Sequence, residues 1–427
     1  MMIPKRVASA VINSLKGGVV PRTGLSYITV GRSNEIDAIL HDVDIVADGG
    51  AAFRFIEGRY GSGKSFLLQA VRNYVLDRGF VVIDADLSPE RRLHGRNGQG
   101  LATYRELMAN MSTRTMPEGS ALGLVLDRWM ASIVERASDR NDTVSVMKTA
   151  SSDIAPLEPM VHGFDMGGVL MAYARGYCAE DDTLRQNAMR WLRGEFRTRT
   201  EAKAALGVNA VITDDDWYDY VKLLAMFLRS AGYKGLIVMI DELVNIYKIP
   251  NRISRESNYE KILSMYNDVL QGRARHLGVM MCGTPECVEN PQRGVFSYEA
   301  LRSRLEDGRF SCEGRRDMLA PIIKLDPLTA AEMTVLTEKL ADIHAVLFGY
   351  ERTMTEEDLI SFVKLEYARI GSESYITPRE VVRDFIELLD IVHQHPGVDV
   401  SQLLKSGDFE FSKGAPEDDS DIPDFVL

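Results

Sequence analysis

The sequence predicts a mixed α/β fold built around a parallel sheet, and three observations point to it. Apolar runs of strand length, such as residues 51–57, alternate with amphipathic patterns of helical length. A glycine-rich loop joins the first of these runs to a helix and a further apolar run, which is the order of a strand–loop–helix–strand unit. Residues 328–405 show three consecutive helical patterns. We therefore expect an α/β core with a long helical insertion and a C-terminal helical lid.

The glycine-rich loop GRYGSGKS fits the pattern G-x-x-x-x-G-K-S of phosphate-binding loops, or P-loops. Glycines let backbone N–H groups turn inward around a phosphate. Lys64 suits the β- and γ-phosphates of ATP, and the Ser65 hydroxyl suits Mg²⁺. A glycine-rich turn that matches by chance is the alternative, but the flanking strand and helix patterns favour a P-loop. The predicted ATP-binding residues are Gly58, Arg59, Tyr60, Gly61, Ser62, Gly63, Lys64, Ser65 and Phe66.

A second apolar run, GLIVMIDELVNI, ends in Asp241 and Glu242. An aspartate at the end of a strand can complete the Mg²⁺ shell begun by Ser65, so Ser65 and Asp241 are the predicted metal ligands. The adjacent Glu242 is suited to orient and polarise the attacking water as a base. Such an ending is common by itself. Together with the P-loop it predicts an ATPase.

The next apolar run, HLGVMMCGTPE, ends at Thr284, and arginines follow it. In ATPases of the AAA+ class, which this order of motifs resembles, the corresponding strand ends in a polar residue that contacts the γ-phosphate or the water. An ordinary turn at Thr284 is an equally compatible interpretation. Arg302, Arg304 and Arg309 follow on a helix and loop, and the planar, always charged guanidinium suits transition-state charge. Arg304 is our first candidate for an arginine finger, although exposed helical arginines are more often only solvated.

Each of the three helical patterns in residues 328–405 opens at a threonine followed by acids, which is an N-cap signature. A small helical lid after an α/β core is the AAA+ arrangement. In that class an arginine at the start of a late lid helix reaches the γ-phosphate, and Arg379 occupies that position, with Arg383 one turn further on. The predicted catalytic residues are then Lys64, Glu242, Thr284, Arg304 and Arg379.

Four stretches together resemble the BrxD-like ATP-binding protein family of bacterial BREX-type phage-defence loci: VPRTGLSYITVGRSNEID, GRYGSGKSFLLQAVRNYV, FVVIDADLSPERR and YITPREVVRDFIELLD. The resemblance extends over residues 21–395. Gly31, Arg32 and Glu35 also resemble the N-terminal box of origin-recognition-like AAA+ ATPases. The family implies ATP-driven action on DNA or on DNA-modifying and helicase-like defence proteins. The AAA+ class implies a homo-oligomer.

Residues 91–211 exceed what a minimal core needs and predict a mostly helical insertion. Their arginines can contact DNA phosphates without reading sequence, and Trp191 and Phe196 are candidates for base stacking. Solvated faces or ion pairs with nearby acids are the alternative. The arginines lie in two groups: Arg91, Arg92 and Arg96 in a loop, and Arg185, Arg190, Arg193, Arg197 and Arg199 on a helix and its end.

Composition sets outer limits. The 427 residues suffice for about two to three domains, and the four cysteines show no metal or disulfide spacing. No segment is apolar enough to span a bilayer, and the first residues are a poor secretory signal, so we expect a soluble cytoplasmic protein without membrane contacts. Residues 406–427 hold seven acids and one lysine, half of the net charge of −12, and predict a disordered acidic tail. Docking of its aromatic residues on a partner is the alternative.

The predicted domains are residues 1–90 (N-terminal segment and first part of the ATPase core), 91–211 (insertion), 212–327 (second part of the core), 328–405 (lid) and 406–427 (tail). The predicted function is that of an AAA+ ATPase that drives or switches an assembly acting on DNA. A nucleotide-switched signalling or scaffold NTPase that does not contact DNA is the alternative, and salt-dependent DNA binding with and without ATP separates the two. A metabolic kinase is disfavoured, because the lid and the arginine-rich helix suit neighbouring subunits rather than a small substrate.

Overall fold

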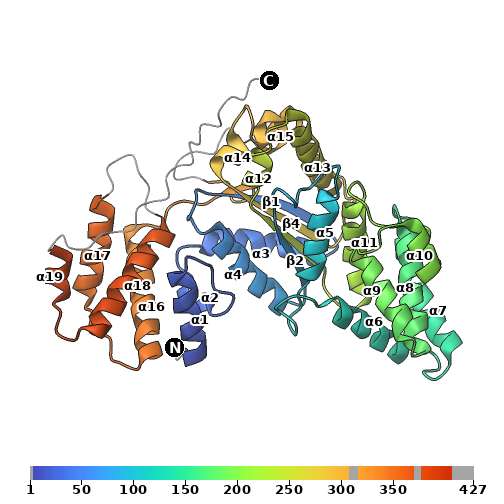
Figure 1. Cartoon of the computed structure of the whole chain (residues 1–427), viewed down its shortest axis with the longest axis horizontal. Coiled ribbons are helices and arrows are strands. Elements are labelled where there is room, and N and C mark those ends of the chain that lie inside the picture. Colours follow the sequence, from blue (N-terminus) through green and yellow to red (C-terminus); the bar gives the residue numbers. More distant parts are fainter. Residues whose placement is uncertain (1–2, 307–315, 370–376, 406–427) are drawn as a thin grey trace. The chain divides into compact units, whose positions relative to one another are not determined.

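The computed structural model describes residues 3–306, 316–369 and 377–405 (Figure 1). The chain forms two compact units, each assembled from segments that lie apart in the sequence. The glycine-rich loop belongs to the first unit, except for its first residue, Gly58, which belongs to the second. The first unit comprises Met1–Ser33, Arg59–Ala70 and Leu325–Leu427, and the second comprises Asn34–Gly58 and Val71–Lys324.

The second unit contains a five-stranded sheet whose paired strands are all parallel, which confirms the predicted α/β class with a parallel sheet. Its strands are β1 (Ala51–Glu57), β2 (Val81–Asp86), β3 (Leu236–Asp241), β4 (Leu277–Gly283) and β5 (Ile322–Lys324). The order across the sheet is β2-β3-β4-β1-β5, so β4 lies between β1 and β3.

The two strands β3 and β4 are apolar on both faces. Every residue of β3 and β4 is buried, which is typical of parallel strands covered by helices on both sides. The register aligns the carboxyl ends of the strands: Glu57 of β1 pairs with Gly283 of β4 and Lys324 of β5, and Asp86 of β2 pairs with Asp241 of β3. The polar residues that follow these ends therefore lie along one edge of the sheet.

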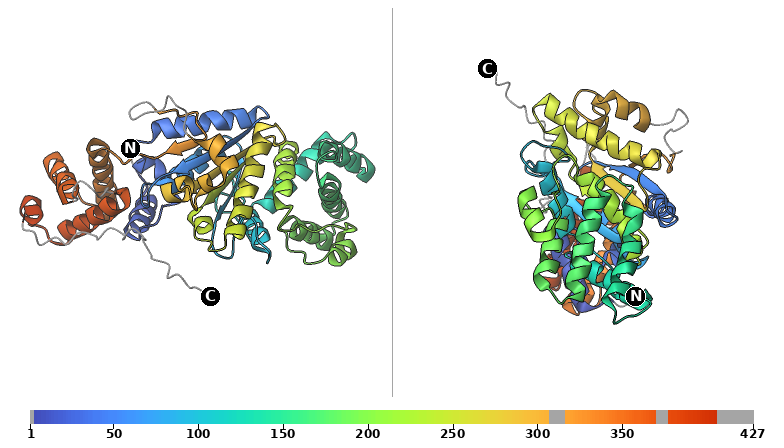
Figure 2. Two further views of the ribbon diagram at one scale, coloured as in Figure 1. Left: turned by 90° about the horizontal axis from the view of Figure 1, so that it is seen from above. Right: turned by 90° about the vertical axis from the view of Figure 1, so that its right-hand side faces the viewer.

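Helices surround this sheet and continue beyond it. They are α3 (Ser33–Ala47), α5 (Gln99–Ala109), α6 (Leu122–Arg136), α7 (Thr143–Ile154), η1 (Ala155–Leu157), α8 (Gly163–Cys178), α9 (Asp182–Leu192), α10 (Arg199–Leu206), α11 (Trp217–Ser230), α12 (Val244–Tyr247), α13 (Arg252–Leu270), α14 (Pro285–Glu289), η2 (Val295–Ser297) and α15 (Glu299–Leu305). Figure 2 shows α6 to α10 as a group at one end of this unit, away from the strands. This group nevertheless shares one continuous hydrophobic core with the sheet, in which Trp129 meets Phe227 edge-on at 5.1 Å between ring centroids.

The first unit is helical. Its helices are α1 (Lys5–Lys16), α2 (Leu25–Ile28), α16 (Ala330–Phe348), α17 (Glu356–Arg369), α18 (Pro378–Gln394) and α19 (Val400–Lys405), and α4 (Lys64–Asp77) begins in it. Thr329, Thr355 and Thr377 accept hydrogen bonds from the first turns of α16, α17 and α18, which confirms the predicted N-caps. Helix α1 packs against α16 and α18, and the three share a hydrophobic core of their own.

Among the helices of the described ranges, none is both long enough and apolar enough to cross a membrane.

A buried ion pair joins β1 to α3 and yields a prediction on stability. Arg54 and Asp42 are each 6% exposed, and Nη2 of Arg54 lies 2.9 Å from Oδ1 of Asp42. Asp42→Asn leaves a buried guanidinium without its counter-charge, so we expect the free energy of unfolding to fall by about 3–5 kcal/mol in urea denaturation. The control is Asp44→Asn, two residues along the same helix, where the pair with Arg78 is exposed and the loss is below about 1 kcal/mol. Equally small losses in both variants would contradict a structural role for the buried pair.

Candidate functional site

The glycine-rich loop has backbone conformations that depend on glycine. Gly61 and Gly63 have φ angles of +75° and +96°, in the left-handed region that side chains disfavour. The N–H of Ser62 donates to the carbonyl three residues earlier at 3.1 Å, and α4 begins at Lys64, directly after the last glycine. The loop therefore turns tightly into the N-terminus of a 14-residue helix, whose first N–H groups lack partners within the helix.

The side chain of Lys64 folds back over this loop. Its Nζ donates to the carbonyl of Arg59 at 2.9 Å and lies 5.9 Å from the centre of the Tyr60 ring. The Ser62 hydroxyl is buried and has no hydrogen-bond partner in the described structure, whereas Ser65 is exposed. An ammonium group, an unpartnered buried hydroxyl and left-handed glycines on one short loop fit a phosphate group, whose oxygens would accept hydrogen bonds from these donors.

Two further residues of the first unit hold the loop. Arg32 is 5% exposed, and its Nη2 donates to the carbonyls of Ser62 at 3.1 Å and Asp326 at 2.9 Å. It therefore joins the loop to the segment that leads into α16. Thr377, the N-cap of α18, lies so close to Gly61 that a Cβ there would be 2.8 Å from the threonine Cβ and Oγ1. The sequence analysis named Arg32 only as part of a box that resembles origin-recognition-like AAA+ ATPases, and did not predict it as a site residue.

Arg379 lies in the first turn of α18, as expected, but contacts the N-terminal segment of the chain. Its Nε and Nη2 donate to the carbonyl of Gly18 at 3.1 and 2.6 Å. These bonds engage two of the three guanidinium nitrogens, so a phosphate contact through the same two nitrogens requires Arg379 to release Gly18.

In the second unit, Asp241 and Glu242 lie at the carboxyl end of β3. Asp241 is 9% exposed, and its Oδ1 accepts a hydrogen bond from the N–H of Glu242 at 2.8 Å. Glu242 has a φ of +61°, a left-handed conformation that costs a residue with a side chain about 1–2 kcal/mol. Strained residues of this kind cluster at functional sites, where the surrounding structure holds them.

A third acid lies at the same edge and was not among the predicted site residues. Asp86 ends β2 directly beside Asp241. Burial, together with the negative charge of Asp241, raises the pKa of Asp86. The signal for it was present, because FVVIDADL is an apolar run that closes in an aspartate just as GLIVMIDEL does.

Thr284 follows β4 and lies between the start of the loop and the Asp-Glu pair. The ladder of β4 continues beyond the strand ends: the N–H of Gly58 donates to the Gly283 carbonyl, and the N–H of Leu243 donates to the Cys282 carbonyl, both at 3.1 Å. Thr284 is half-buried and is the N-cap of α14. Capping is also what an ordinary strand end would do, so the position alone leaves both interpretations of Thr284 open.

The arginines after this strand have local partners. On α15, Nη1 of Arg304 donates to the carbonyl of Ala300 at 2.6 Å, and Arg302 pairs with Glu306 at 3.3 Å. Both side chains are exposed. Arg309 lies outside the described residues.

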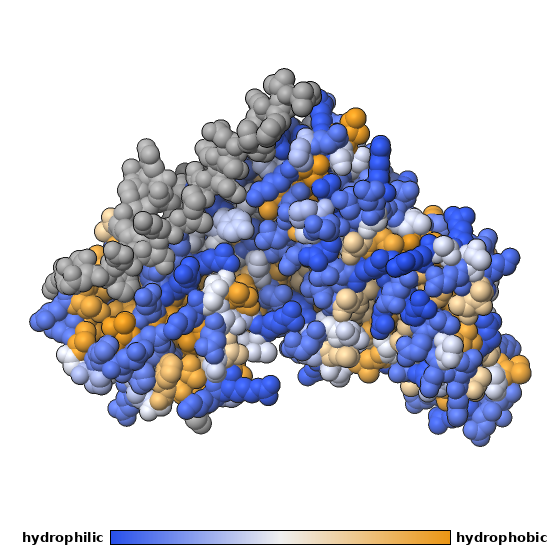
Figure 3. All heavy atoms as spheres, in the orientation of Figure 1, coloured by the Kyte–Doolittle hydropathy of each residue, from blue (hydrophilic) through white to orange (hydrophobic). Residues whose placement is uncertain are grey.

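Some of the candidate arginines of the insertion are engaged in ion pairs, whereas Arg96, Arg197 and Arg199 are exposed. Arg185, Arg190 and Arg193 each lie near a carboxylate, at 2.9, 3.2 and 4.0 Å. Trp191 and Phe196 are only 1% and 3% exposed, so their prediction as base-stacking residues is wrong: both belong to the hydrophobic core. Over α6 to α10, the face seen in Figure 3 is largely hydrophilic, with hydrophobic residues interspersed.

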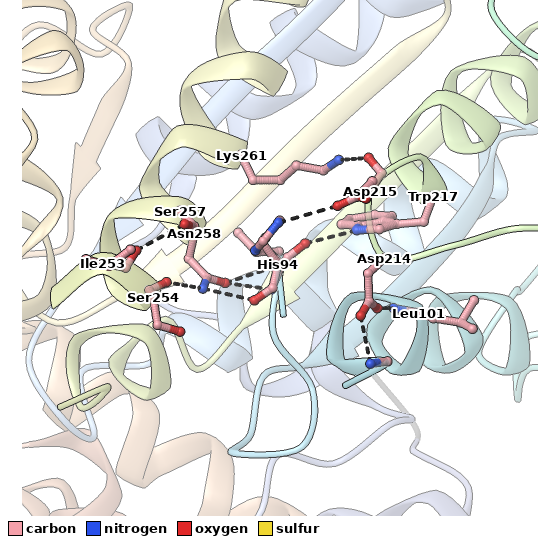
Figure 4. A network of polar contacts seen from close by, with 12 residues as sticks. His94, Leu101, Asp214, Asp215, Trp217, Ile253, Ser254, Ser257, Asn258 and Lys261 are labelled. Atoms are coloured by element: carbon pink, nitrogen blue, oxygen red, sulfur yellow. Dashed lines mark hydrogen bonds and ion pairs between the residues drawn. The ribbon is translucent and has the colours of Figure 1, made fainter. Parts of the chain in front are cut away.

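The arginine loop, residues 88–98, is held by a polar network (Figure 4). The side-chain oxygen of Asn258, which is fully buried, accepts hydrogen bonds from two successive N–H groups of the loop, both at 3.0 Å. Asp214 accepts two more where the loop enters α5, both at 2.7 Å. Nε of Arg91 donates to the carbonyl of Asp86 at 3.0 Å, so this arginine is anchored at the sheet edge.

A family model described as BREX system ATP-binding protein BrxC/D matches residues 3–408, nearly the whole chain. The match includes the glycine-rich loop, the Asp-Glu pair and the lid helices. Among curated proteins, none matches this chain.

The left-handed conformation of Glu242 generates a prediction. Glycine adopts a φ of +61° without strain, so we expect Glu242→Gly to be more stable than Glu242→Ala by about 1 kcal/mol in urea denaturation. Lys248 is the control, because its φ of −71° is ordinary, and there alanine should exceed glycine by about 0.5–1 kcal/mol. Alanine being the more stable residue at both positions would contradict the strain at Glu242.

Proposed function

This chain belongs to the BREX system ATP-binding protein BrxC/D family, and from that premise we propose that it is an AAA+ P-loop ATPase. It binds and hydrolyses ATP, and thereby drives or switches a phage-defence assembly that acts on DNA. The observation that carries the proposal is the glycine-rich loop, which combines left-handed glycines, a lysine folded over them and an unpartnered buried hydroxyl. The strand order supports it, because β4 lies between the strand that leads into the loop and the strand that ends in Asp-Glu.

In this proposal the loop holds the triphosphate. Backbone N–H groups from Gly58 to Phe66 surround the phosphates, and Lys64 exchanges its bond to a loop carbonyl for the β- and γ-phosphate oxygens. The Ser65 hydroxyl and the Asp241 carboxylate are the ligands for Mg²⁺, which when bound supplies positive charge against the phosphate oxygens.

In the proposed hydrolysis, Glu242 is the general base. The water oxygen forms a bond to the γ-phosphorus while the bond from that phosphorus to the ADP oxygen breaks, and the Glu242 carboxylate accepts a proton from the water. Thr284 and Arg379 are the proposed contacts to the γ-phosphate. Arg304 is the proposed finger, supplied to a neighbouring copy in a homo-oligomer.

The action on DNA is proposed to run through partner proteins. Three of the eight arginines that we predicted as possible DNA contacts, Arg185, Arg190 and Arg193, are in ion pairs, and both aromatic candidates are buried. The paired arginines and the buried aromatic residues favour the second candidate function, a nucleotide-switched scaffold that does not itself contact DNA.

Two substitutions separate binding from chemistry. Lys64→Ala removes the ammonium that neutralises the phosphates, so we expect calorimetry to show ATP affinity nearly abolished. Glu242→Gln keeps the size of the side chain but cannot accept the proton, so hydrolysis should fall by about 10²–10⁴-fold while Mg·ATP still binds. Lys234→Ala, an exposed lysine at the amino end of β3, is the control for both measurements. Unchanged ATP affinity in Lys64→Ala would rule out the loop as the binding site.

Mixing tests the proposed finger. Arg304→Ala carries an intact loop, and Lys64→Ala carries an intact arginine. We expect each variant alone to turn over poorly and a mixture to regain part of the activity, since a finger supplied from a neighbour can be worth about 10³–10⁵-fold. Arg302→Ala, on the same helix, tests the second candidate in the same way. Normal turnover by Arg304→Ala alone would show that this residue is not the finger.

A further inference from the structure

Asn245 bonds two chain segments at the carboxyl edge of the sheet. Its Nδ2 donates to the carbonyl of Leu87 at 2.9 Å and to the carbonyl of Glu242 at 3.3 Å, and its backbone N–H donates to Glu242 at 3.0 Å. Leu87 directly follows β2, and its own N–H donates to the carbonyl of Asp241 at 3.1 Å. These bonds form a closed circuit from the turn after β3 to the end of β2 and back.

The circuit encloses the strained residue. With a φ of +61°, Glu242 keeps its left-handed conformation only if its neighbours hold it there. The Glu242 carbonyl, which is the group that would rotate if the backbone relaxed, accepts one bond from the backbone N–H of Asn245 and one from the Asn245 side chain. Only the side-chain bonds, to Glu242 and to Leu87, depend on asparagine. Relaxation would also redirect the Cα–Cβ bond, and with it the carboxylate.

We propose that Asn245 is a positioning residue for hydrolysis: it holds the backbone of Glu242 in the left-handed conformation and so orients the carboxylate. The inference rests on the proposed function, in which Glu242 is the base. Asparagine suits the position because its single amide nitrogen carries two N–H donors, one for each of two carbonyls. An aspartate of the same shape has no donor when ionised and would add charge beside Asp241.

A merely structural role for Asn245 predicts a different outcome. In that case the loss of its hydrogen bonds lowers the stability of the turn but does not change the orientation of the Glu242 carboxylate. If Asn245 positions Glu242, its loss slows turnover only while the Glu242 carboxylate is present. If Asn245 is only structural, its loss does not depend on that carboxylate.

The test uses the full chain and Asn245→Ala. We expect kcat for ATP to fall between about 10- and 10²-fold, because a misplaced base loses rate steeply, while the affinity for Mg·ATP in calorimetry is unchanged. Asn110→Ala is the matched control: this half-buried asparagine donates to a carbonyl within β2, that of Asp84 at 3.0 Å, and its hydrogen bonds in the described ranges do not reach the Glu242 turn. Its kcat should equal that of the parent.

A double variant distinguishes positioning from structure. In the Glu242→Gln background the base is already lost, so Asn245→Ala should slow turnover no further. A second loss of the same size there, or a parental kcat in Asn245→Ala, would overturn the inference and leave the proposed function standing. Equal turnover by the parent and Glu242→Gln would instead overturn the proposed function. If the alanine variant does not fold, Asn245→Ser replaces it with the same expected loss, because one short hydroxyl cannot donate to both carbonyls.

Discussion

The position of β4 between β1 and β3 is the constraint on which the candidate site depends. Backbone bonds from Gly58 to Gly283 and from Leu243 to Cys282 carry the ladder past the ends of the strands, so the edge continues as an ordered surface. Neighbouring strands lie about 4.8 Å apart, which puts the start of the glycine-rich loop about 10 Å from the Asp-Glu strand, with Thr284 between them. Because backbone atoms alone set this spacing, the side chains at the edge are free to serve chemistry.

Several features at the carboxyl edge of the sheet lower the stability of the fold. Asp86 and Asp241 lie side by side, and their mutual repulsion is one reason why the pKa of Asp86 is raised. Glu242 adds a left-handed backbone, at a cost of about 1–2 kcal/mol. Three neighbouring acids and a strained turn are unfavourable for folding. In our proposal, the hydrogen bonds from Asn245 are what keeps the Glu242 backbone in this conformation.

Local patterns made much of this fold predictable, and long-range packing limited the rest. Parallel strands follow from apolar runs, and the threonine caps follow from three-residue spacing, so both were confirmed. The packing of α1 on α16 and α18 joins segments more than 300 residues apart and leaves no local signal. Trp191 was misassigned because an amphipathic helix does not reveal which of its aromatic residues meets a core. The pair of Arg185 with Asp127 spans 58 residues, so composition could not tell a paired arginine from one that is open to DNA.

The first unit links the loop directly to the lid, which gives the proposed ATPase a route from binding to motion. Arg32 bonds both Ser62 in the loop and Asp326 before α16, and Thr377 at the start of α18 lies against Gly61. A hydrogen bond from a charged group contributes about 1.5–3 kcal/mol, so a loop that changes shape around a phosphate either carries its partners with it or loses that energy. Since the loop and the lid helices belong to one compact unit, these two contacts are the route by which nucleotide binding at the proposed site would reach the lid helices.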